Sequence, residues 1–162
     1  MPTMKILAAG FTLIELMVVV TVIAILAMLA MPNFQDKIVR DQITEALRLT
    51  DLAKGPVATA WTTTATLPAD NMNAGLPPPE KIVNNFVSAV TVDAGAIHMT
   101  FGNRVNGAIR GKTLSLRPAV MDDLPVVPVV WVCGWANAPD KMSIKGANKT
   151  DVAKNFLPRD CR

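Results

Sequence analysis

The sequence predicts an α+β fold in which a long N-terminal α-helix packs against a four-stranded antiparallel β-sheet, with a C-terminal loop after the last strand. Three observations carry this prediction: an uncharged apolar run, a charged stretch with helical periodicity, and four strand-like runs separated by turn residues. The chain has 162 residues, 51% of them hydrophobic, and a net charge of +3. This length suits one domain of ordinary size, and so small a charge does not indicate a nucleic-acid-binding protein.

The apolar run forms the first part of the predicted helix. Residues 16–31 read LMVVVTVIAILAMLAM, without a charge and with Thr21 as the only polar interruption. Counted from Phe11 to Met31 the run has 21 residues, which is enough to cross a bilayer core of about 30 Å as a helix. Glu15 lies near its start, where a carboxylate costs free energy unless it has a partner.

The predicted helix continues beyond Pro32 into a stretch with charges of both signs. Apolar residues recur there every three or four positions, which predicts one buried stripe: Val39, Ile43, Ala46, Leu49, Ala53, Val57, and Ala60 or Trp61. We therefore expect one helix over residues 11–62 whose first half spans a membrane. Pro32 predicts a kink or local unwinding, unless a separate helix simply starts there. Gly55-Pro56 predicts a further bend.

The rest of the chain predicts a loop followed by the sheet. Threonines, prolines and Gly75 make residues 63–86 an irregular αβ-loop. Within residues 87–135, alternating or apolar runs predict strands at 88–92, 96–101, 112–117 and 126–135, with Asp93-Ala94-Gly95 as the first turn. The apolar face of this sheet needs a cover, and the stripe on the helix is the large candidate.

The first residues narrow the role of the apolar helix. Residues 1–10, MPTMKILAAG, carry one Lys and no acid. A cut after Gly10 removes this leader and keeps the helix, whereas a cut after Ala30 would leave Met28 at a position that favours small residues. The sequence Gly10-Phe11-Thr12-Leu13-Ile14-Glu15 resembles the prepilin signature of type IV pilins and the related pseudopilins.

The resemblance implies a processing and assembly route. A prepilin peptidase would cleave between Gly10 and Phe11 and methylate the new amine of Phe11, with which Glu15 of a neighbouring subunit would pair during assembly. Pro32 matches the proline of a segment that can unwind in the filament. The chain would wait in the bacterial inner membrane as a single-pass protein, and the pilus assembly machinery would then polymerise it into an extracellular pilus. The alternative is an ordinary anchor with a tolerated Glu15.

The resemblance also implies a disulfide. Cys133 and Cys161, the two cysteines of the chain, match the pair that closes the C-terminal loop of type IV pilins, here residues 133–162. An anchored domain outside the cytoplasm favours disulfides, and a bridge over 27 intervening residues contributes about 3–4 kcal/mol in the chain-entropy model. A metal site is the weaker alternative, because only His98 accompanies the two thiols.

The sequence offers little for catalysis. His98 lies in a strand-like run, Asp122-Asp123 reads as a solvated loop, and phosphate-binding, nucleophile-elbow or metal-ligand motifs are missing from the sequence. We therefore expect no enzyme, no cofactor and no metal. Six basic residues fall in the last 22, which favours a solvated face or a weak DNA-contacting surface: Lys141, Lys145, Lys149, Lys154, Arg159 and Arg162.

The predicted function is a structural subunit that polymerises through its N-terminal helix into a type IV pilus serving adhesion, twitching motility or DNA uptake. A pseudopilin of a type II secretion system shares the motif and the helix, although major pseudopilins more often carry a calcium site and lack the C-terminal disulfide. A DNA-binding minor pilin would share the same motif and helix, and an anchored monomeric periplasmic domain would need only the apolar run.

Overall fold

The computed structural model describes residues 10–162 and, for residues 30–33, the backbone alone. The chain divides into two compact units, one ending at Gln35 and one spanning Asp36–Arg162. The predicted leader, residues 1–10, lies outside the described residues except for Gly10.

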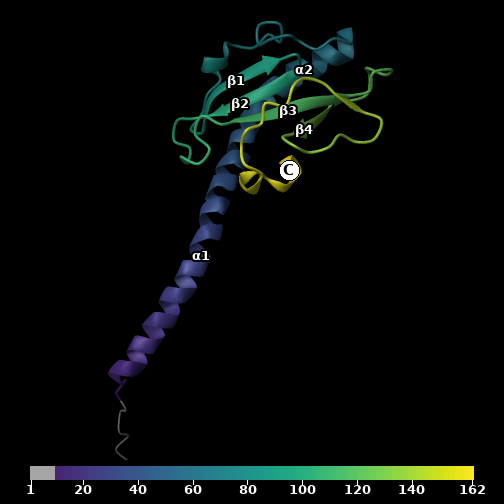
Figure 1. Cartoon of the computed structure of the whole chain (residues 1–162). Coiled ribbons are helices and arrows are strands. Elements are labelled where there is room, and N and C mark those ends of the chain that lie inside the picture. The colour runs from purple at the N-terminus through teal and green to yellow at the C-terminus, as the bar shows by residue number, and fades with distance from the viewer. Residues whose placement is uncertain (1–9) are drawn as a thin grey trace, which may run out of the picture. The chain divides into compact units, whose positions relative to one another are not determined.

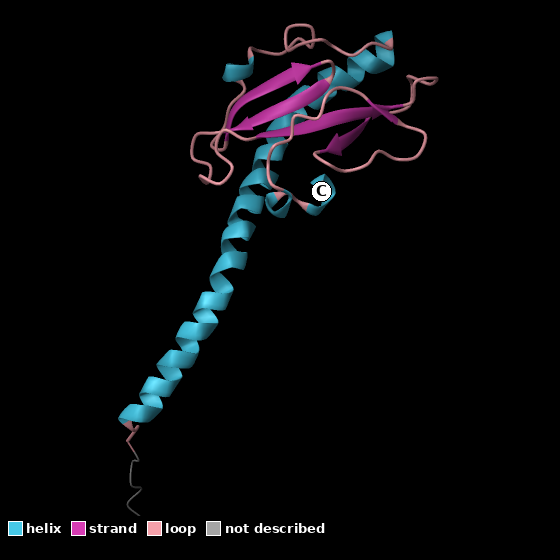
Figure 2. Cartoon of the chain, in the orientation of Figure 1, coloured by secondary structure: helices cyan, strands magenta, loops and turns pink. Residues whose placement is uncertain are grey.

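The long N-terminal helix is confirmed. It comprises α1 (Leu13–Leu47), a 3₁₀ turn η1 (Arg48–Thr50) and α2 (Asp51–Thr64) (Figure 2). In the 3₁₀ turn the Thr50 hydroxyl donates to the Leu47 carbonyl at 2.6 Å, a local bond that competes with regular helical pairing. The helix ends at Ala65, which has a left-handed φ of 52° and donates its N–H to the Trp61 carbonyl.

The predicted buried stripe is also confirmed within the second unit. Its buried members come from the C-terminal part of α1 and from α2: Val39, Ile43, Ala46, Ala53, Val57 and Trp61. Leu49 is only partly buried, and the last position is Trp61 rather than Ala60. Spacings of three and four residues place these side chains on one face of the helix, which packs against the sheet.

The sheet is antiparallel, and its main strands follow one another in chain order (Figure 1). Its strands are β1 (Val87–Asp93), β2 (Ala96–Phe101), β3 (Thr113–Val120), β4 (Val130–Cys133) and β5 (Ser143–Ile144). The four predicted strands are present, and the two-residue β5, which pairs with β3, was not predicted.

Two boundaries differ from the sequence prediction because of proline. The strand predicted from residue 126 begins at Val130, because Pro125 and Pro128 have no N–H to donate to a ladder. β3 instead continues past its expected end, through Pro118 to Val120. The Pro118 carbonyl accepts the N–H of Lys145 beyond the last residue of β3 that pairs with β2, so the missing N–H lies outside the β2–β3 ladder.

The core lies between the helix and one face of the sheet. Strand β2 contributes Ile97, Met99 and Phe101 to it, each at most 1% exposed. The turn between β1 and β2 has positive φ at Ala94 and Gly95, and a Cβ on Gly95 would lie 2.8 Å from the Leu67 side chain. This turn was predicted, and its close contact with the αβ-loop requires glycine.

The αβ-loop covers the free edge of β1. The buried Asn71 amide donates to the carbonyls of Val90 and Pro77, both at 3.0 Å, and accepts the Val92 N–H at 2.7 Å. One side chain thus satisfies backbone groups of β1 that a neighbouring strand would otherwise pair with. The short 3₁₀ turn η2 (Pro79–Lys81) follows in the same loop.

Candidate functional site

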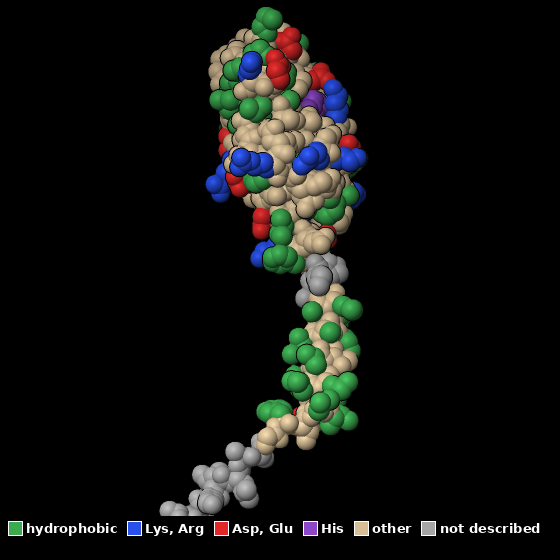
Figure 3. Space-filling view, turned by 90° about the vertical axis from the view of Figure 1, so that its left-hand side faces the viewer, with side chains coloured by type: hydrophobic (Ala, Val, Ile, Leu, Met, Phe, Trp, Pro, Cys, Tyr) green, Lys and Arg blue, Asp and Glu red, His purple; other side chains and the backbone are tan. Residues whose placement is uncertain are grey.

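The first candidate site is the apolar segment at the start of α1. From Phe11 to Leu29, fourteen large apolar side chains are exposed, with Phe11 at 82% and Val19, the least exposed, at 46%. Figure 3 shows hydrophobic side chains along this segment. In the described chain, one helix is long and apolar enough to cross a membrane, and it spans Leu13–Thr64. Such a surface needs lipid or other protein as a partner.

The start of α1 is defined by Thr12. Its hydroxyl accepts the backbone N–H of Glu15 at 3.3 Å, and its carbonyl accepts that of Leu16 at 3.2 Å. Thr12 is thus the N-cap, and Glu15 occupies the third helical position, where a negative charge is favourable. The sequence carries a signal for this cap, the Thr-x-x-Glu pattern of a capping box, and the cap was nevertheless not predicted.

The other predicted residues of this segment are Gly10, Phe11 and Pro32. Gly10 and Phe11 precede α1, and a Cβ on Gly10 would contact nothing within 4 Å in the described chain. Pro32 lies inside α1, and the kink expected there stays a prediction. The structure therefore joins Thr12 and Glu15 in the first turn of α1, with Phe11 immediately before it.

The second candidate site is the C-terminal region, where the predicted disulfide is confirmed. The Cys133 and Cys161 sulfurs are 2.03 Å apart. Next to the bridge, Gly134 has a φ of +56°, and a Cβ there would lie 2.5 Å from the Cys161 carbonyl oxygen. The backbone N–H of Trp135 donates to the same oxygen at 3.0 Å. Only glycine fits beside the bridge, because any side chain would collide with this carbonyl.

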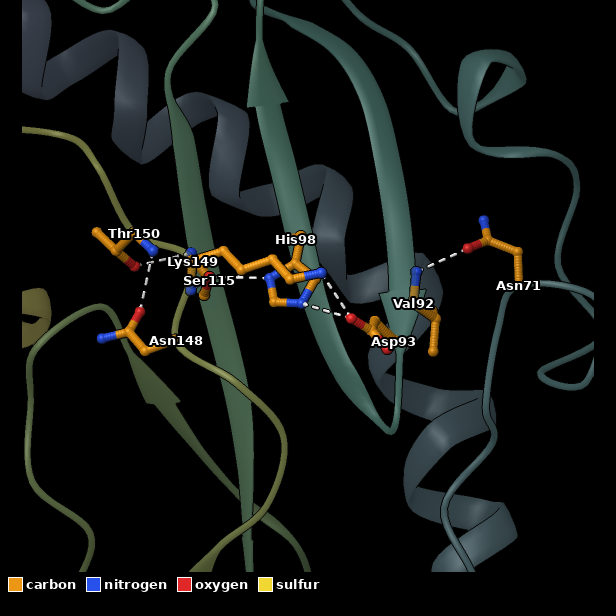
Figure 4. A network of polar contacts seen from close by, with 8 residues as sticks. All are labelled: Asn71, Val92, Asp93, His98, Ser115, Asn148, Lys149 and Thr150. Carbon is orange, nitrogen blue, oxygen red and sulfur yellow. Dashed lines mark hydrogen bonds and ion pairs between the residues drawn. The ribbon is translucent and has the colours of Figure 1, made fainter.

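A buried polar network joins the disulfide-bounded region to the sheet (Figure 4). The His98 Nδ1 and Ser115 Oγ atoms are 2.9 Å apart, and Ser115 Oγ accepts the backbone N–H of Lys149 at 2.9 Å. The Lys149 ammonium donates to the Asp93 carboxylate at 2.6 Å. His98, which the sequence places in a strand-like run without a catalytic role, is buried and hydrogen-bonded.

The environment of this region shifts the pKa values of three of its titratable groups. The hydrogen bond and charge of Lys149 lower the pKa of Asp93. Burial, followed by the Lys149 charge, lowers the pKa of His98. Asp122 likewise has a lowered pKa, because its carboxylate accepts hydrogen bonds from Lys145 and Ser143.

This network resembles a Ser-His-Asp hydrolytic triad in residue types only. Ser115 is fully buried, so its hydroxyl has no access to a substrate, and the His98 Nε2 lies 3.9 Å from the Asp93 carboxylate. The arrangement can hold chain segments together, whereas a nucleophile needs an accessible oxygen.

Most of the predicted basic cluster is already engaged within the protein. Lys145 pairs with Asp122 at 2.7 Å, and the Lys154 ammonium lies 5.6 Å from the centroid of the Trp135 ring. Lys149 is held by Asp93, as described above. Arg162 donates to backbone carbonyls of the same region. In the described chain, the two exposed cations of this cluster outside such contacts are Lys141 and Arg159.

Comparison with known proteins gives matches to both parts of the chain. Residues 39–162 match the family described as pilin (bacterial filament), and residues 7–31 match the prokaryotic N-terminal methylation motif. The type IV major pilin protein PilE of Neisseria gonorrhoeae is 35% identical over 98% of this chain and 96% of its own length. The fimbrial protein EcpC of Eikenella corrodens is 34% identical over 98% of this chain and 94% of its own.

A relative with lower sequence identity also matches nearly the whole chain. The type IV major fimbrial protein FimA of Dichelobacter nodosus is 27% identical over 98% of this chain and 99% of its own length. These matches thus extend over nearly the whole chain. This chain belongs to the pilin family of bacterial filament proteins and is a structural subunit of the type IV pilus.

Proposed function

We propose that the chain assembles with copies of itself through the apolar segment from Phe11 to Leu29 and acts as a major subunit without a catalytic role. The three relatives named above are a major pilin, a fimbrial protein and a major fimbrial protein. Their names favour this reading over a type II secretion pseudopilin or a DNA-binding minor pilin. The buried Ser115 supports the absence of a catalytic role.

One observation carries this proposal: the apolar segment has no cover within the described chain. Its fourteen large side chains are between 46% and 82% exposed. Burying a side chain of this size contributes about 1.5–3 kcal/mol, so together they represent on the order of 20 kcal/mol or more. A lipid bilayer satisfies this surface in the precursor, and neighbouring subunits satisfy it in the filament.

We further propose that a prepilin peptidase cleaves the chain between Gly10 and Phe11 and methylates the new amine. Gly10 supports this step because it has no steric need to be glycine: an added Cβ would meet nothing within 4 Å in the described chain. A glycine that packing does not require is consistent with recognition by an enzyme that reads this position.

Glu15 is proposed to pair with the amine of Phe11 on a neighbouring subunit. Its backbone N–H is already bonded to Thr12, whereas its exposed carboxylate has no ion-pair partner in the described chain. A carboxylate in an apolar surrounding is costly alone, and pairing with an amine offsets much of that cost. Apolar packing fixes axial position poorly, so this pair would set the step between subunits.

The proposed localisation follows from the same features. The apolar helix and the methylation motif fit an inner-membrane precursor, and the disulfide fits a domain outside the cytoplasm. Transfer from membrane to filament would require the pilus assembly machinery.

Contact with DNA is proposed only as a weak property of the exposed Lys141 and Arg159, with a small sensitivity to salt. Because the other basic residues of the cluster already have partners, we expect few phosphate contacts and a shallow dependence of affinity on salt. Titration of purified filaments with duplex DNA at several salt concentrations tests this. A steep dependence that persists in a Lys141→Ala/Arg159→Ala variant would contradict it.

Substitution of Glu15 tests the assembly proposal. We expect Glu15→Ala to leave the chain abundant in the membrane and to reduce surface filaments, measured by shearing and quantitative immunoblotting, at least tenfold. Glu45→Ala is the matched control, because Glu45 is also an exposed acid of α1 but lies in the second unit. Normal filament yield from Glu15→Ala would contradict the proposal, as would an equal loss in both variants.

A further inference from the structure

Three consecutive residues of the disulfide-bounded region bind β3 where β4 no longer pairs with it. The last β3–β4 pair at this end joins Leu116 to Cys133. Beyond it, Thr150 Oγ1 accepts the Ser115 N–H at 3.1 Å and the Asp151 N–H donates to the Thr113 carbonyl at 3.1 Å. The Asp151 carboxylate accepts the Thr113 N–H. We name Lys149–Asp151, with these bonds to β3, the loop latch.

The latch depends on the protonation state of His98. A serine hydroxyl has one hydrogen to donate. Ser115 Oγ accepts the Lys149 N–H, and His98 Nδ1, which lies 2.9 Å away, is the acceptor that the described chain offers to the serine hydrogen. We therefore assign the Ser115 hydrogen to an unprotonated Nδ1, which places the proton of the neutral ring on Nε2.

Protonation of His98 disrupts this arrangement. A proton on Nδ1 would face Ser115 Oγ, so the serine hydrogen would need a new acceptor in a site where Ser115 is fully buried. Nε2, which is itself buried, has no hydrogen-bond partner in the described chain and carries a proton in both states, so it does not distinguish them. The difference lies at Ser115, because a buried hydroxyl hydrogen without an acceptor is costly, and the cationic ring therefore disfavours the closed latch.

We propose that the loop latch is an acid-sensitive switch: protonation of His98 releases Lys149–Asp151 from β3 and uncovers the face of the sheet that carries His98 and Ser115. The released segment would present a changed surface on the disulfide-bounded region while the bridge keeps it attached.

The charged groups around His98 are consistent with a closed latch that favours the neutral ring. The Lys149 ammonium faces it from the loop, the Asp93 carboxylate faces it from the end of β1, and Arg117 lies two residues beyond Ser115 on β3 with its guanidinium donating to Gly134. Burial and Lys149 together lower the pKa of His98 despite the opposing effect of Asp93.

The sign of the pH dependence follows from this lowered pKa. A released, solvated imidazole has a pKa of about 6.5, so below that pH the open state binds more protons than the closed state. The stability of the closed latch is therefore fully present above about pH 6.5 and decreases as the pH falls below that value.

Hydrogen exchange of the full chain in detergent micelles, followed by mass spectrometry, tests the switch. After correction for intrinsic exchange rates, we expect amides of residues 149–151 to lose protection several-fold between about pH 7 and about pH 5, while the core of β2 stays protected. His98 is the only histidine, so its carbon-bound proton resonances also give its titration directly. A pKa at or above about 6.5 would overturn the proposal.

Three variants give the controls. His98→Asn keeps an acceptor for the Ser115 hydroxyl and cannot titrate, so its latch should show no acid-induced loss. Lys149→Met, at an exposed position that should not impair folding, should show a smaller loss than the parent, because one influence that lowers the His98 pKa is gone. Lys145→Met removes a comparable ion pair to Asp122 and should behave as the parent. An undiminished acid-induced loss in either His98→Asn or Lys149→Met would overturn the proposal.

Discussion

Asn71 offers a sharp test of how the αβ-loop is attached, because a single-atom change reverses its hydrogen bonding. The residue is 5% exposed, and its amide nitrogen donates to the carbonyls of Val90 and Pro77 at 3.0 Å. In Asn71→Asp an oxygen replaces that nitrogen and faces both carbonyls, so two bonds are lost and a negative charge is buried. Lost bonds of this kind cost about 0.5–1.5 kcal/mol each and an unpaired buried group adds about 1–3 kcal/mol. We therefore expect the free energy of unfolding to fall by about 3 kcal/mol near neutral pH.

The assay is urea or thermal unfolding of the full chain in detergent micelles, with Asn73→Asp as the control. Asn73 is exposed in the same loop, so the same chemical change there should cost less than about 0.5 kcal/mol. Burial should raise the pKa of the new carboxyl, so the deficit of Asn71→Asp relative to the parent should shrink as the pH is lowered. Equal stability of the two variants would refute the reasoning.

Two further predictions separate the roles of the disulfide and of the two parts of the helix. Replacing Cys133 and Cys161 together by Ser should lower the free energy of unfolding by about 3–4 kcal/mol, seen as a lower thermal midpoint that a reductant no longer affects. An unchanged midpoint would contradict this. Ile43→Ala, in the fully buried stripe, should cost about 2–5 kcal/mol of folding stability, measured by urea unfolding. Ile23→Ala, at a position that is 57% exposed, should leave that stability unchanged and weaken filaments instead; the reverse pattern would show that the assignment of the two parts is wrong.

Patterns that repeat along the chain made most of the fold predictable. The stripe from Val39 to Trp61 follows the helical period over many residues, so it was found in the correct place. The four main strands were found because apolar runs alternate with turn residues. The two-residue β5, Ser143–Ile144, is too short to show any period. The continuation of β3 through Pro118 depends on which side of the strand its missing N–H faces, and that is set by tertiary pairing.

The features of the candidate sites also differ in whether they could be predicted from the sequence. The N-terminal motif and the cysteine pair could be read from residues because their spacing is short or their chemistry is distinctive. The buried network could not, because the bond between Ser115 and Lys149 joins residues 34 positions apart. The engagement of the basic cluster was equally hidden: Lys145 and Lys149 look free in the sequence, yet Asp122 and Asp93 neutralise them in the fold.

Intact-mass and peptide mass spectrometry of filaments sheared from the cell surface tests the central claim most directly. The account predicts one dominant chain that begins at Phe11, carries one methyl group on its terminal amine and has Cys133 and Cys161 joined. A filament chain that retains residues 1–10, or one whose amino terminus lies at another position, would contradict it.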